Sequence, residues 1–267
     1  MNKILLGSLI LALCAGVSGC GDDDASVADA GEGHHEHDGG EHDAALPDAS
    51  EPDAMIDDDA GDEPPVEDTA YYPVTDGARW VYRHSGGSTW DEDVVLTHAT
   101  HEGKPAFMLR DTSGPSGNRS ETVLARVGSQ IARVYREELN GDSLQATASY
   151  APGFVRFDHA WVTRADGYVE TLAYERVERD ADGAITAEGE RSHHYTIEAH
   201  DDTVEVPAGT FEDCLRVRRS RVRASTAAPV EGDEDLFWFC PGVGKVREQD
   251  TVSLESEELV SFDIPDE

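Results

Sequence analysis

The feature that most constrains this chain is an acidic stretch over residues 21–70. It holds 19 Asp and Glu residues and no Lys or Arg, and alanine, glycine and proline fill most of the remainder. Such a segment repels itself and cannot bury enough apolar surface to offset its chain entropy. We therefore expect a disordered tether with an end-to-end distance of roughly 40 Å, and a hydrophobic core built only from residues 71–267.

The residues before the tether have the layout of a secretory signal peptide. Lys3 is the only positive charge there, and the apolar or small residues 4–19 end at Cys20. A membrane-spanning helix needs about 20 predominantly apolar residues, whereas this stretch is shorter and is diluted by glycine and serine. Residues 1–19 are therefore expected to be removed as a signal peptide.

The letters "VSGC" that end at Cys20 resemble the lipobox of bacterial lipoproteins. The resemblance implies that the Cys20 thiol receives diacylglycerol and that residues 20–70 form a lipid-anchored acidic tether. Gly21, rather than Asp, follows the cysteine, which by resemblance to lipoprotein sorting rules implies the outer membrane, on its periplasmic or surface side. The alternative is an ordinary secretory cleavage beside an incidental cysteine.

A histidine-rich tract lies inside the tether. His34, His35, His37 and His42 stand among carboxylates in "GHHEHDGGEHD". Imidazole and carboxylate together suit zinc, copper or nickel, so the tract is a candidate metal buffer. The alternative is a solvated linker, because a disordered chain supplies no fixed geometry for an ion.

From residue 71 onward the chain has a composition and a spacing of turns that are typical of β-strands. Short runs rich in β-branched and aromatic residues, such as "ARWVYRH", "YVETLAYERV" and "LFWFCPGVGKV", alternate with turn signals such as Asn140-Gly141 and Asp182-Gly183. No long window of helical periodicity competes. We expect an all-β domain over 71–267, a single antiparallel, strongly curved sheet that forms a half-barrel or open barrel.

Two stretches resemble an uncharacterised group of bacterial envelope lipoproteins. They are "YYPVTDGARWVYRH" near the start of the domain and "VEVPAGTFEDCLRVRR", followed by "FWFCPGVGKVRE", near its end. The resemblance implies an envelope location and the half-barrel of lipoprotein carriers, with an apolar concave side. It implies no reaction. In physical terms, Pro207 presets a turn, Gly209 allows positive φ, and Gly242 and Gly244 predict a bend near another backbone.

Local patterns for catalytic and metal-binding sites are weak. His194, Glu198 and His200 would share one face of a strand, but a rise of about 3.3 Å per residue separates the two histidines by roughly 20 Å. The spacing of "DADGAI" around Asp182 is similar to a calcium loop, but no glutamate falls at the twelfth position. A hairpin turn is the better interpretation of that segment.

Cys214 and Cys240 are the cysteines that remain if Cys14 is cleaved away and Cys20 is acylated. In an oxidising compartment we expect them to form a disulfide that closes a 27-residue loop and stabilises the domain by about 3 kcal/mol. If their strands form a hairpin with the cysteines opposed, facing residues have numbers that sum to 454.

That register predicts further pairs across the hairpin. Arg219 would meet Asp235, Arg221 would meet Asp233, and Arg223 would meet Glu231, while Arg216 would lie over Trp238 as a cation–π pair. The arginine cluster is thereby interpreted as a set of structural ion pairs and not as an anion site.

Composition limits the partners. Residues 71–267 carry a net charge of −17, since the whole chain has −35, the tether −19 and Lys3 +1; nucleic acid is therefore not expected. We interpret the protein as a lipid-anchored, non-catalytic binding or assembly module of the cell envelope. Its partners would be an apolar small molecule held in the curved sheet, or another envelope protein, and no cofactor is expected.

Two alternatives stay open at this point. One is an envelope hydrolase whose carboxylates and histidines come together from distant segments. The other is metal buffering through the tether.

The first testable prediction concerns the anchor. Replacing Cys20 by Ser removes the thiol that would be acylated, so incorporation of a fatty-acid analogue and retention in the membrane fraction should both be lost. Metabolic labelling followed by fractionation measures this. A labelled Cys20→Ser protein would contradict the assignment.

Overall fold

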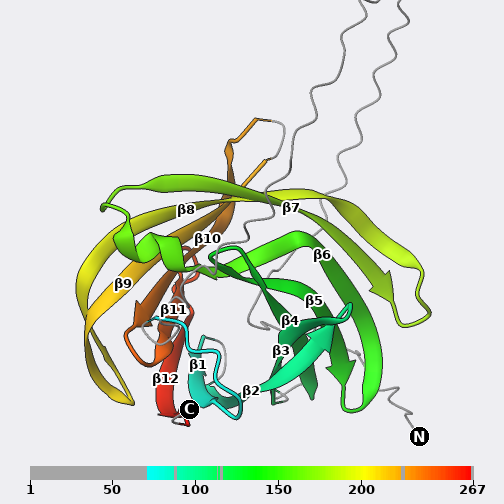
Figure 1. Ribbon diagram of the computed structural model, residues 1–267, viewed down its shortest axis with the longest axis horizontal. Helices are drawn as coiled ribbons and strands as arrows, with labels where there is room; N and C mark the ends of the chain where they lie inside the picture. Colours follow the sequence, from blue (N-terminus) through cyan, green and yellow to red (C-terminus); the bar gives the residue numbers. More distant parts are fainter. Residues whose placement is uncertain (1–70, 87–88, 113, 115–116, 224–225, 266–267) are drawn as a thin grey trace, which may run out of the picture. The chain divides into compact units, whose positions relative to one another are not determined.

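The computed structural model describes residues 71–86, 89–112, 114, 117–223 and 226–265. These residues form twelve strands and one short 3₁₀ helix, which Figure 1 shows in chain order. None of the helical segments among them has the length and apolarity that a membrane crossing requires.

The strands vary from seven to 22 residues in length. In chain order the elements are β1 (Arg79–Ser85), β2 (Trp90–His101), β3 (Lys104–Asp111), β4 (Asn118–Val127), β5 (Gln130–Asn140), β6 (Ser143–Asp158), η1 (His159–Thr163), β7 (Val169–Asp180), β8 (Ile185–Val206), β9 (Gly209–Val222), β10 (Pro229–Cys240), β11 (Gly244–Asp250) and β12 (Ser256–Asp263).

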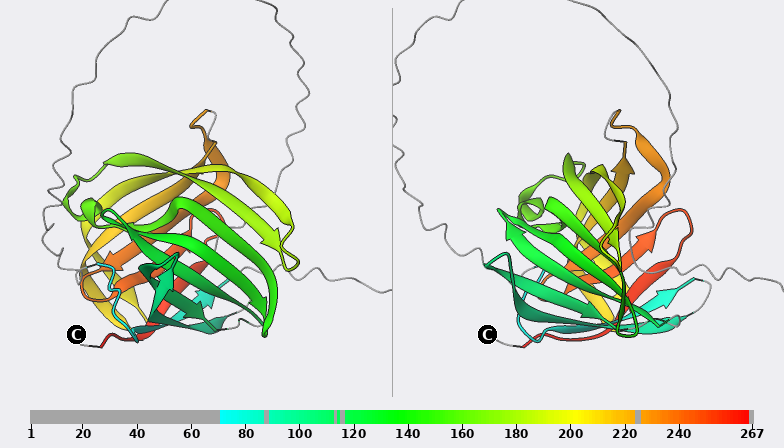
Figure 2. Two further views of the ribbon diagram at one scale, coloured as in Figure 1. Left: turned by 45° about the vertical axis from the view of Figure 1, so that its right-hand side comes forward. Right: turned by 90° about the vertical axis from the view of Figure 1, so that its right-hand side faces the viewer.

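Every strand pairs antiparallel with its neighbour in sequence, and β1 pairs with both β2 and β12. The sheet is therefore a closed ring of strands, as Figures 1 and 2 show from three directions. The predicted fold class, an all-β, antiparallel and strongly curved sheet, is confirmed. Its curvature goes further than a half-barrel or open barrel, because the β1–β12 pairing leaves no free sheet edge.

Alternation of side chains places one face of each strand inside the ring. In β1, Trp80, Tyr82 and His84 are buried while their neighbours are more exposed. Within the ring, aromatic side chains pack edge to face around Phe157, whose ring centroid lies 5.0 Å from Phe239 and 5.6 Å from Trp161. This aromatic cluster fills part of the barrel interior.

The two stretches that resemble envelope lipoproteins meet where the barrel closes. The indole Nε1 of Trp80 donates to the carbonyl of Val243 at 2.7 Å, and the Tyr82 hydroxyl donates to the carbonyl of Lys245 at 2.9 Å. Gly244 has φ +95° and lies so close to Pro73 that a Cβ there would be 3.3 Å from the proline ring. Another segment thus approaches Gly244 as predicted, but through the Pro73 ring and not through its backbone, and nothing lies within 4 Å of a Cβ placed at Gly242.

The β8–β9 connection has the turn geometry that the sequence predicts. Gly209 takes φ +140°, and Phe211 packs against the core directly afterwards. The Ala208 N–H, in the turn, donates to the carbonyl of Leu259 at 2.9 Å. This contact ties the end of the β8–β9 hairpin to β12.

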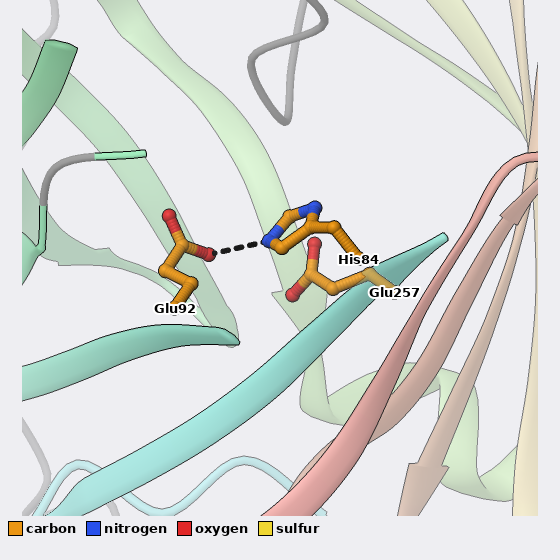
Figure 3. Close-up of side chains that lie close together, drawn as sticks. All are labelled: His84, Glu92 and Glu257. Atoms are coloured by element: carbon orange, nitrogen blue, oxygen red, sulfur yellow. Dashed lines mark hydrogen bonds and ion pairs between the residues drawn. The ribbon is translucent and has the colours of Figure 1, made fainter. Parts of the chain in front are cut away.

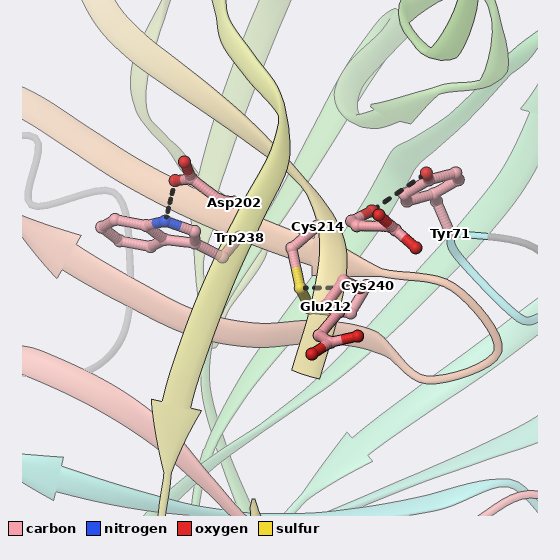
Figure 4. The surroundings of a disulfide bond; sticks show 7 residues. Tyr71, Asp202, Glu212, Cys214, Trp238 and Cys240 are labelled. Atoms are coloured by element: carbon pink, nitrogen blue, oxygen red, sulfur yellow. Dashed lines mark hydrogen bonds between the residues drawn. A yellow bond between two sulfur atoms is a disulfide. The ribbon is translucent and has the colours of Figure 1, made fainter. Parts of the chain in front are cut away.

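The predicted disulfide is present between Cys214 and Cys240, whose Cα atoms are 4.2 Å apart (Figure 4). The predicted hairpin register is also confirmed over most of β9 and β10. Phe239 faces Leu215 and Phe237 faces Val217, and from Phe239 to Glu234 the residue numbers of each facing pair add up to 454, as predicted.

Two of the three predicted charge pairs form. Arg219 contacts Asp235 at 2.6 Å, and Arg221 lies 3.5 Å from Asp233. The third pair, between Arg223 and Glu231, is wrong. The register shifts between Pro229 and Glu234, and the Arg223 N–H instead donates to the carbonyl of Ala228.

The side chain of Arg216 also differs from its prediction. It faces Trp238 in the register, but its guanidinium contacts Glu198 and Asp202, each at 2.9 Å. Arg247 is the residue whose guanidinium lies over the Trp238 ring, 5.6 Å from its centroid. Carboxylates within reach provide the stronger attraction for Arg216.

The second testable prediction concerns the disulfide. Reduction should lower the free energy of unfolding by about 3 kcal/mol, because the bond restricts a 27-residue loop in the unfolded chain. Urea unfolding with and without dithiothreitol measures the difference. The Cys214→Ala, Cys240→Ala variant is the control and should show no further effect of the reductant; equal stability of the native protein in both conditions would refute the prediction.

Candidate functional site

A cluster of three buried side chains lies inside the barrel, formed by His84, Glu92 and Glu257 (Figure 3). We call it the His84 cluster. Nε2 of His84 lies 3.1 Å from Oε2 of Glu92, and one ligand atom from each of the three residues lies within 4.8 Å of the other two. Only 8%, 6% and 4% of the respective residue surfaces are exposed.

Strand register explains why these three residues meet. His84 on β1 is directly opposite Glu257 on β12, and facing residues of an antiparallel pair point to the same side of the sheet. On the other side of β1, Glu92 faces Tyr82, two residues before His84, and therefore also points inward. The cluster thus exists only because β1 joins β2 to β12.

An aromatic ring fixes the histidine. The indole of Trp90, which faces His84 in the β1–β2 register, stacks on the imidazole at 4.1 Å between ring centroids and with 4° between ring planes. The stack and the Glu92 hydrogen bond together restrict the orientation of the ring, so that Nε2 stays directed at Glu92.

Lys245 connects the cluster to a third carboxylate. Its ammonium lies 2.7 Å from Glu257 and 2.6 Å from Glu248, and 5.0 Å from the centroid of the Tyr82 ring. Glu248 on β11 is directly opposite Glu257 on β12. Two like charges on facing residues repel, and the lysine offsets that repulsion.

Protonation of the cluster reflects its excess of negative charge. Burial lowers the pKa of His84, but the hydrogen bond to Glu92 and the charges of Glu257 and Glu92 outweigh burial, so that the pKa lies above its usual value. Burial raises the pKa of Glu92, and repulsion from Glu257 and Asp111 adds to the effect, while the His84 hydrogen bond opposes it. Both directions mean that the cluster holds protons more strongly than isolated side chains do.

Glu248 shows the opposite behaviour. Burial alone would raise its pKa, but the positive charges of Lys245, Arg156 and Arg219 lower the pKa to about 2. Glu248 is therefore an ionised carboxylate held between cations, in contrast to Glu92.

A cavity lies beside this network. The space inside it that a water molecule can occupy is small, about 10 Å³, which is enough for about one water molecule. Aromatic and aliphatic side chains line it together with three cationic ones, and the lining residues are Val155, Arg156, Trp161, Tyr195, Val217, Arg219, Phe237, Phe239 and Lys245.

The three cations at the cavity are not equivalent. Arg219 contacts Asp235 and lies over the Phe237 ring, 4.9 Å from its centroid, and Lys245 is held by its two glutamates. Arg156 lies 5.9 Å from the centroid of Phe154 and forms no ion pair with the residues that the structure describes. Of the three, Arg156 is the cation without a contact ion pair to a described residue, although its charge also acts on Glu248.

The candidate sites expected from the sequence have different outcomes. Cys20 and the tether histidines His34, His35, His37 and His42 lie outside the described residues, so their roles stay predictions. Cys214 and Cys240 form the disulfide described above.

His194, Glu198 and His200, which would share one face of a strand, do not form a common site. His200 contacts Asp166 at 2.6 Å, whereas Glu198 is held by two arginines of β9, Arg216 and Arg218. The segment around Asp182 is the turn of the β7–β8 hairpin, in which Asp180 accepts backbone N–H bonds.

Sequence reasoning missed the His84 cluster, although each of its members carried a signal. His84 continues the inward alternation of Trp80 and Tyr82, and Glu92 stands in phase with buried Val94 two residues later. Glu257 is likewise in phase with buried Leu259. All three are ionisable residues at positions where the alternation of the strand predicts a buried, apolar side chain, and this pattern could have identified them.

Comparisons with known proteins give no family. The chain matches no family model and no curated protein. Among solved structures, a "putative lipoprotein" from Parabacteroides distasonis shares 16% identity with a TM-score of 0.40. A "putative exported protein with YmcC-like fold" from Bacteroides fragilis shares 11% identity with a TM-score of 0.35. Each comparison covers 73% of this chain and 99% of the other. The lipoprotein resemblance of the two motifs therefore stays a prediction.

The third testable prediction concerns Glu248. A carboxylate whose folded pKa lies below its unfolded pKa contributes stability that is present above the unfolded pKa, 4.5 for an ordinary Glu, and is lost as pH falls through the folded pKa of about 2. Glu248→Gln should therefore be destabilised relative to the native protein at pH 5, and the difference should shrink as pH falls toward 2.

Urea unfolding at several pH values between 5 and 2 measures the two free energies. Glu188→Gln, at an exposed position of β8, is the matched control for the loss of one carboxylate. A difference between the native protein and Glu248→Gln that stays constant over this range would show that the cations around Glu248 do not stabilise its ionised form.

Proposed function

We propose that the protein is a lipid-anchored module of the bacterial cell envelope that binds a small organic anion with an apolar body inside its barrel. One observation carries the proposal, namely the cavity in which four aromatic rings and three cationic side chains meet. Sites for small molecules typically combine mostly apolar walls with a few polar groups that fix the ligand's orientation.

The aromatic side supplies the contact area for the apolar body. Trp161 and Tyr195 form one pair with 5.1 Å between ring centroids, and Phe237 and Phe239 form another at 6.0 Å. Hydrogen bonds fix two of these rings, because Trp161 Nε1 donates to Glu170 and the Tyr195 hydroxyl donates to the carbonyl of Val155. Rigid rings lose little conformational entropy when a ligand binds.

The cationic side chains of the cavity favour an anionic ligand over the purely apolar one that the sequence predicts. A neutral apolar molecule would remove water from Arg156 without replacing it, which costs free energy, whereas Arg219 and Lys245 keep their carboxylate partners. A carboxylate, sulfonate or phosphate would replace that water. The space that is already open inside the cavity is about 10 Å³, which is enough for about one water molecule. A ligand therefore has to displace lining side chains, so that it is small and not a long acyl chain.

The envelope location is supported by the sequence. A signal peptide over residues 1–19, acylation at Cys20 and an acidic tether would hold the domain at the membrane while separating it from the lipid headgroups by tens of ångströms. In such an arrangement the barrel samples small molecules in the aqueous space beside the membrane. The outer membrane is the side implied by Gly21.

An envelope hydrolase is the second candidate, favoured by the His84–Glu92 pair. A buried histidine hydrogen-bonded to a glutamate is a plausible general acid–base couple in chemical terms. However, neither residue lines the cavity, and a general base must lie within hydrogen-bond reach of its substrate. Binding is therefore the function that the geometry supports better.

The fourth testable prediction uses a matched pair of fluorescent probes, 8-anilino-1-naphthalenesulfonate and the neutral N-phenyl-1-naphthylamine. They share an aromatic body and differ by the sulfonate. We expect one site per chain, with the anionic probe bound at least roughly tenfold more tightly, which corresponds to about 1.4 kcal/mol. Fluorescence titration of the purified protein measures both affinities.

Arg156→Gln separates this site from nonspecific binding. Because Arg156 forms no ion pair with described residues, the variant should fold, and its affinity for the anionic probe should fall roughly tenfold or more with little change for the neutral probe. Arg110→Gln, at an exposed position of β3, is the control and should bind like the native protein. Equal affinity for the two probes, or an unchanged affinity in Arg156→Gln, would refute the proposal.

A further inference from the structure

The barrel interior contains three side chains of the types that bind metal ions, and none of them lines the cavity. From the geometry of the His84 cluster we infer a site for a divalent transition-metal ion, with zinc as the best match, held by Nε2 of His84 and by one carboxylate oxygen each from Glu92 and Glu257 (Figure 3). The inference does not rest on the proposed function, because none of the three residues lines the cavity.

The spacing of the donor atoms is the first support. Zinc lies about 2.0–2.2 Å from imidazole nitrogen and carboxylate oxygen, so two ligands at a tetrahedral angle are separated by roughly 3.4 Å. Nε2 of His84 and Oε2 of Glu92 are 3.1 Å apart, and no pair among the three donors exceeds 4.8 Å. Small rotations of the glutamate side chains would complete a three-ligand site with one position open.

The donor types select among ions. One imidazole and two carboxylates suit zinc, iron or manganese, whereas calcium and magnesium take oxygen donors in larger number. All three side chains are buried, on three adjacent strands of a closed sheet. Strands hold ligands in more fixed positions than loops do, and the Trp90 stack fixes the imidazole.

Charge is the second support. Glu92 and Glu257 place two carboxyl groups in the interior, and the lysine that contacts Glu257 is shared with Glu248. Buried carboxylates are unfavourable unless nearby positive charge compensates them. A divalent cation between the two glutamates would stabilise both carboxylates in their ionised form, and the imidazole of His84, once deprotonated, would be a neutral donor to it.

Lys245 is the competitor of such an ion. Its ammonium lies 2.7 Å from Oε1 of Glu257, and a carboxylate has a second oxygen that can bind an ion at the same time. The nearby positive charge nevertheless weakens cation binding. Replacing Lys245 by Met should therefore strengthen it, by roughly tenfold or more, because the variant removes a positive charge 2.7 Å from a ligand carboxylate.

The experiment is isothermal titration of the purified full-length protein with zinc chloride. The parent carries His34→Gln, His35→Gln, His37→Gln and His42→Gln, which removes the tether histidines as a second source of binding. We expect one zinc ion per chain and an increase in melting temperature, and no comparable response to magnesium chloride.

Two variants in this parent assign the site. Glu92→Gln keeps the shape of a ligand while removing its charge, and should weaken zinc binding by at least roughly a hundredfold, which exceeds the effect expected for a residue beyond the ligands. Lys245→Met should tighten it. His101→Gln, a histidine substitution elsewhere on β2, is the control and should leave the affinity unchanged.

The outcomes are decisive even where a variant is less stable. Absence of zinc binding in the parent, or equal affinity in the parent and in a folded Glu92→Gln protein, would show that the His84 cluster is a hydrogen-bonded structural pair. If Glu92→Gln fails to fold, the Lys245→Met result decides, and an affinity that is unchanged or weaker overturns the inference.

Discussion

The pairing of β1 with β12 is the interaction on which the rest of the structure depends. It turns a curved antiparallel sheet into a closed ring and removes both free edges. Two side chains of β1 reinforce it, because Trp80 and Tyr82 donate hydrogen bonds to backbone carbonyls at the start of β11. Without this closure His84 and Glu257 would lie on opposite edges of the sheet.

The closed ring also explains how the barrel contains both an aromatic core and buried charge. Phe157, Trp161 and Phe239 fill one region with edge-to-face contacts. Elsewhere, Glu248, Glu257 and His84 follow one another directly across β11, β12 and β1. Concentrating the ionisable groups in one row lets them share cations and hydrogen bonds, which lowers the cost of burying each one.

Local patterns in the sequence predicted local structure well. The β9–β10 register followed from Cys214 and Cys240 alone, because a hairpin fixes all its facing pairs once one pair is known. The predicted register is wrong at Arg223, because an irregularity in β10 shifts the pairing there. The register correctly placed Arg216 opposite Trp238. The position of its guanidinium was not predicted, because it contacts carboxylates of β8, and no pattern within the β9–β10 hairpin could reveal them.

The candidate site could not be predicted from such local sequence patterns. His84 and Glu257 are 173 residues apart in the sequence, and their meeting depends on ring closure and on the register of β1 with β12. A shift of that register by one residue would turn one of them outward. The buried phase of each residue is readable from alternation, but which buried polar residues face one another is set by the global topology of the barrel.

Lys245 belongs to both features of the interior. It lines the cavity, and its ammonium bridges Glu248 and Glu257. An anion in the cavity attracts that ammonium and so reduces its hold on Glu257, which makes the His84 cluster more attractive to a cation. The converse follows from linkage, since a coupling free energy between two sites is the same in both directions. An anion site and a cation site built around one lysine would therefore strengthen each other, although each can be detected alone.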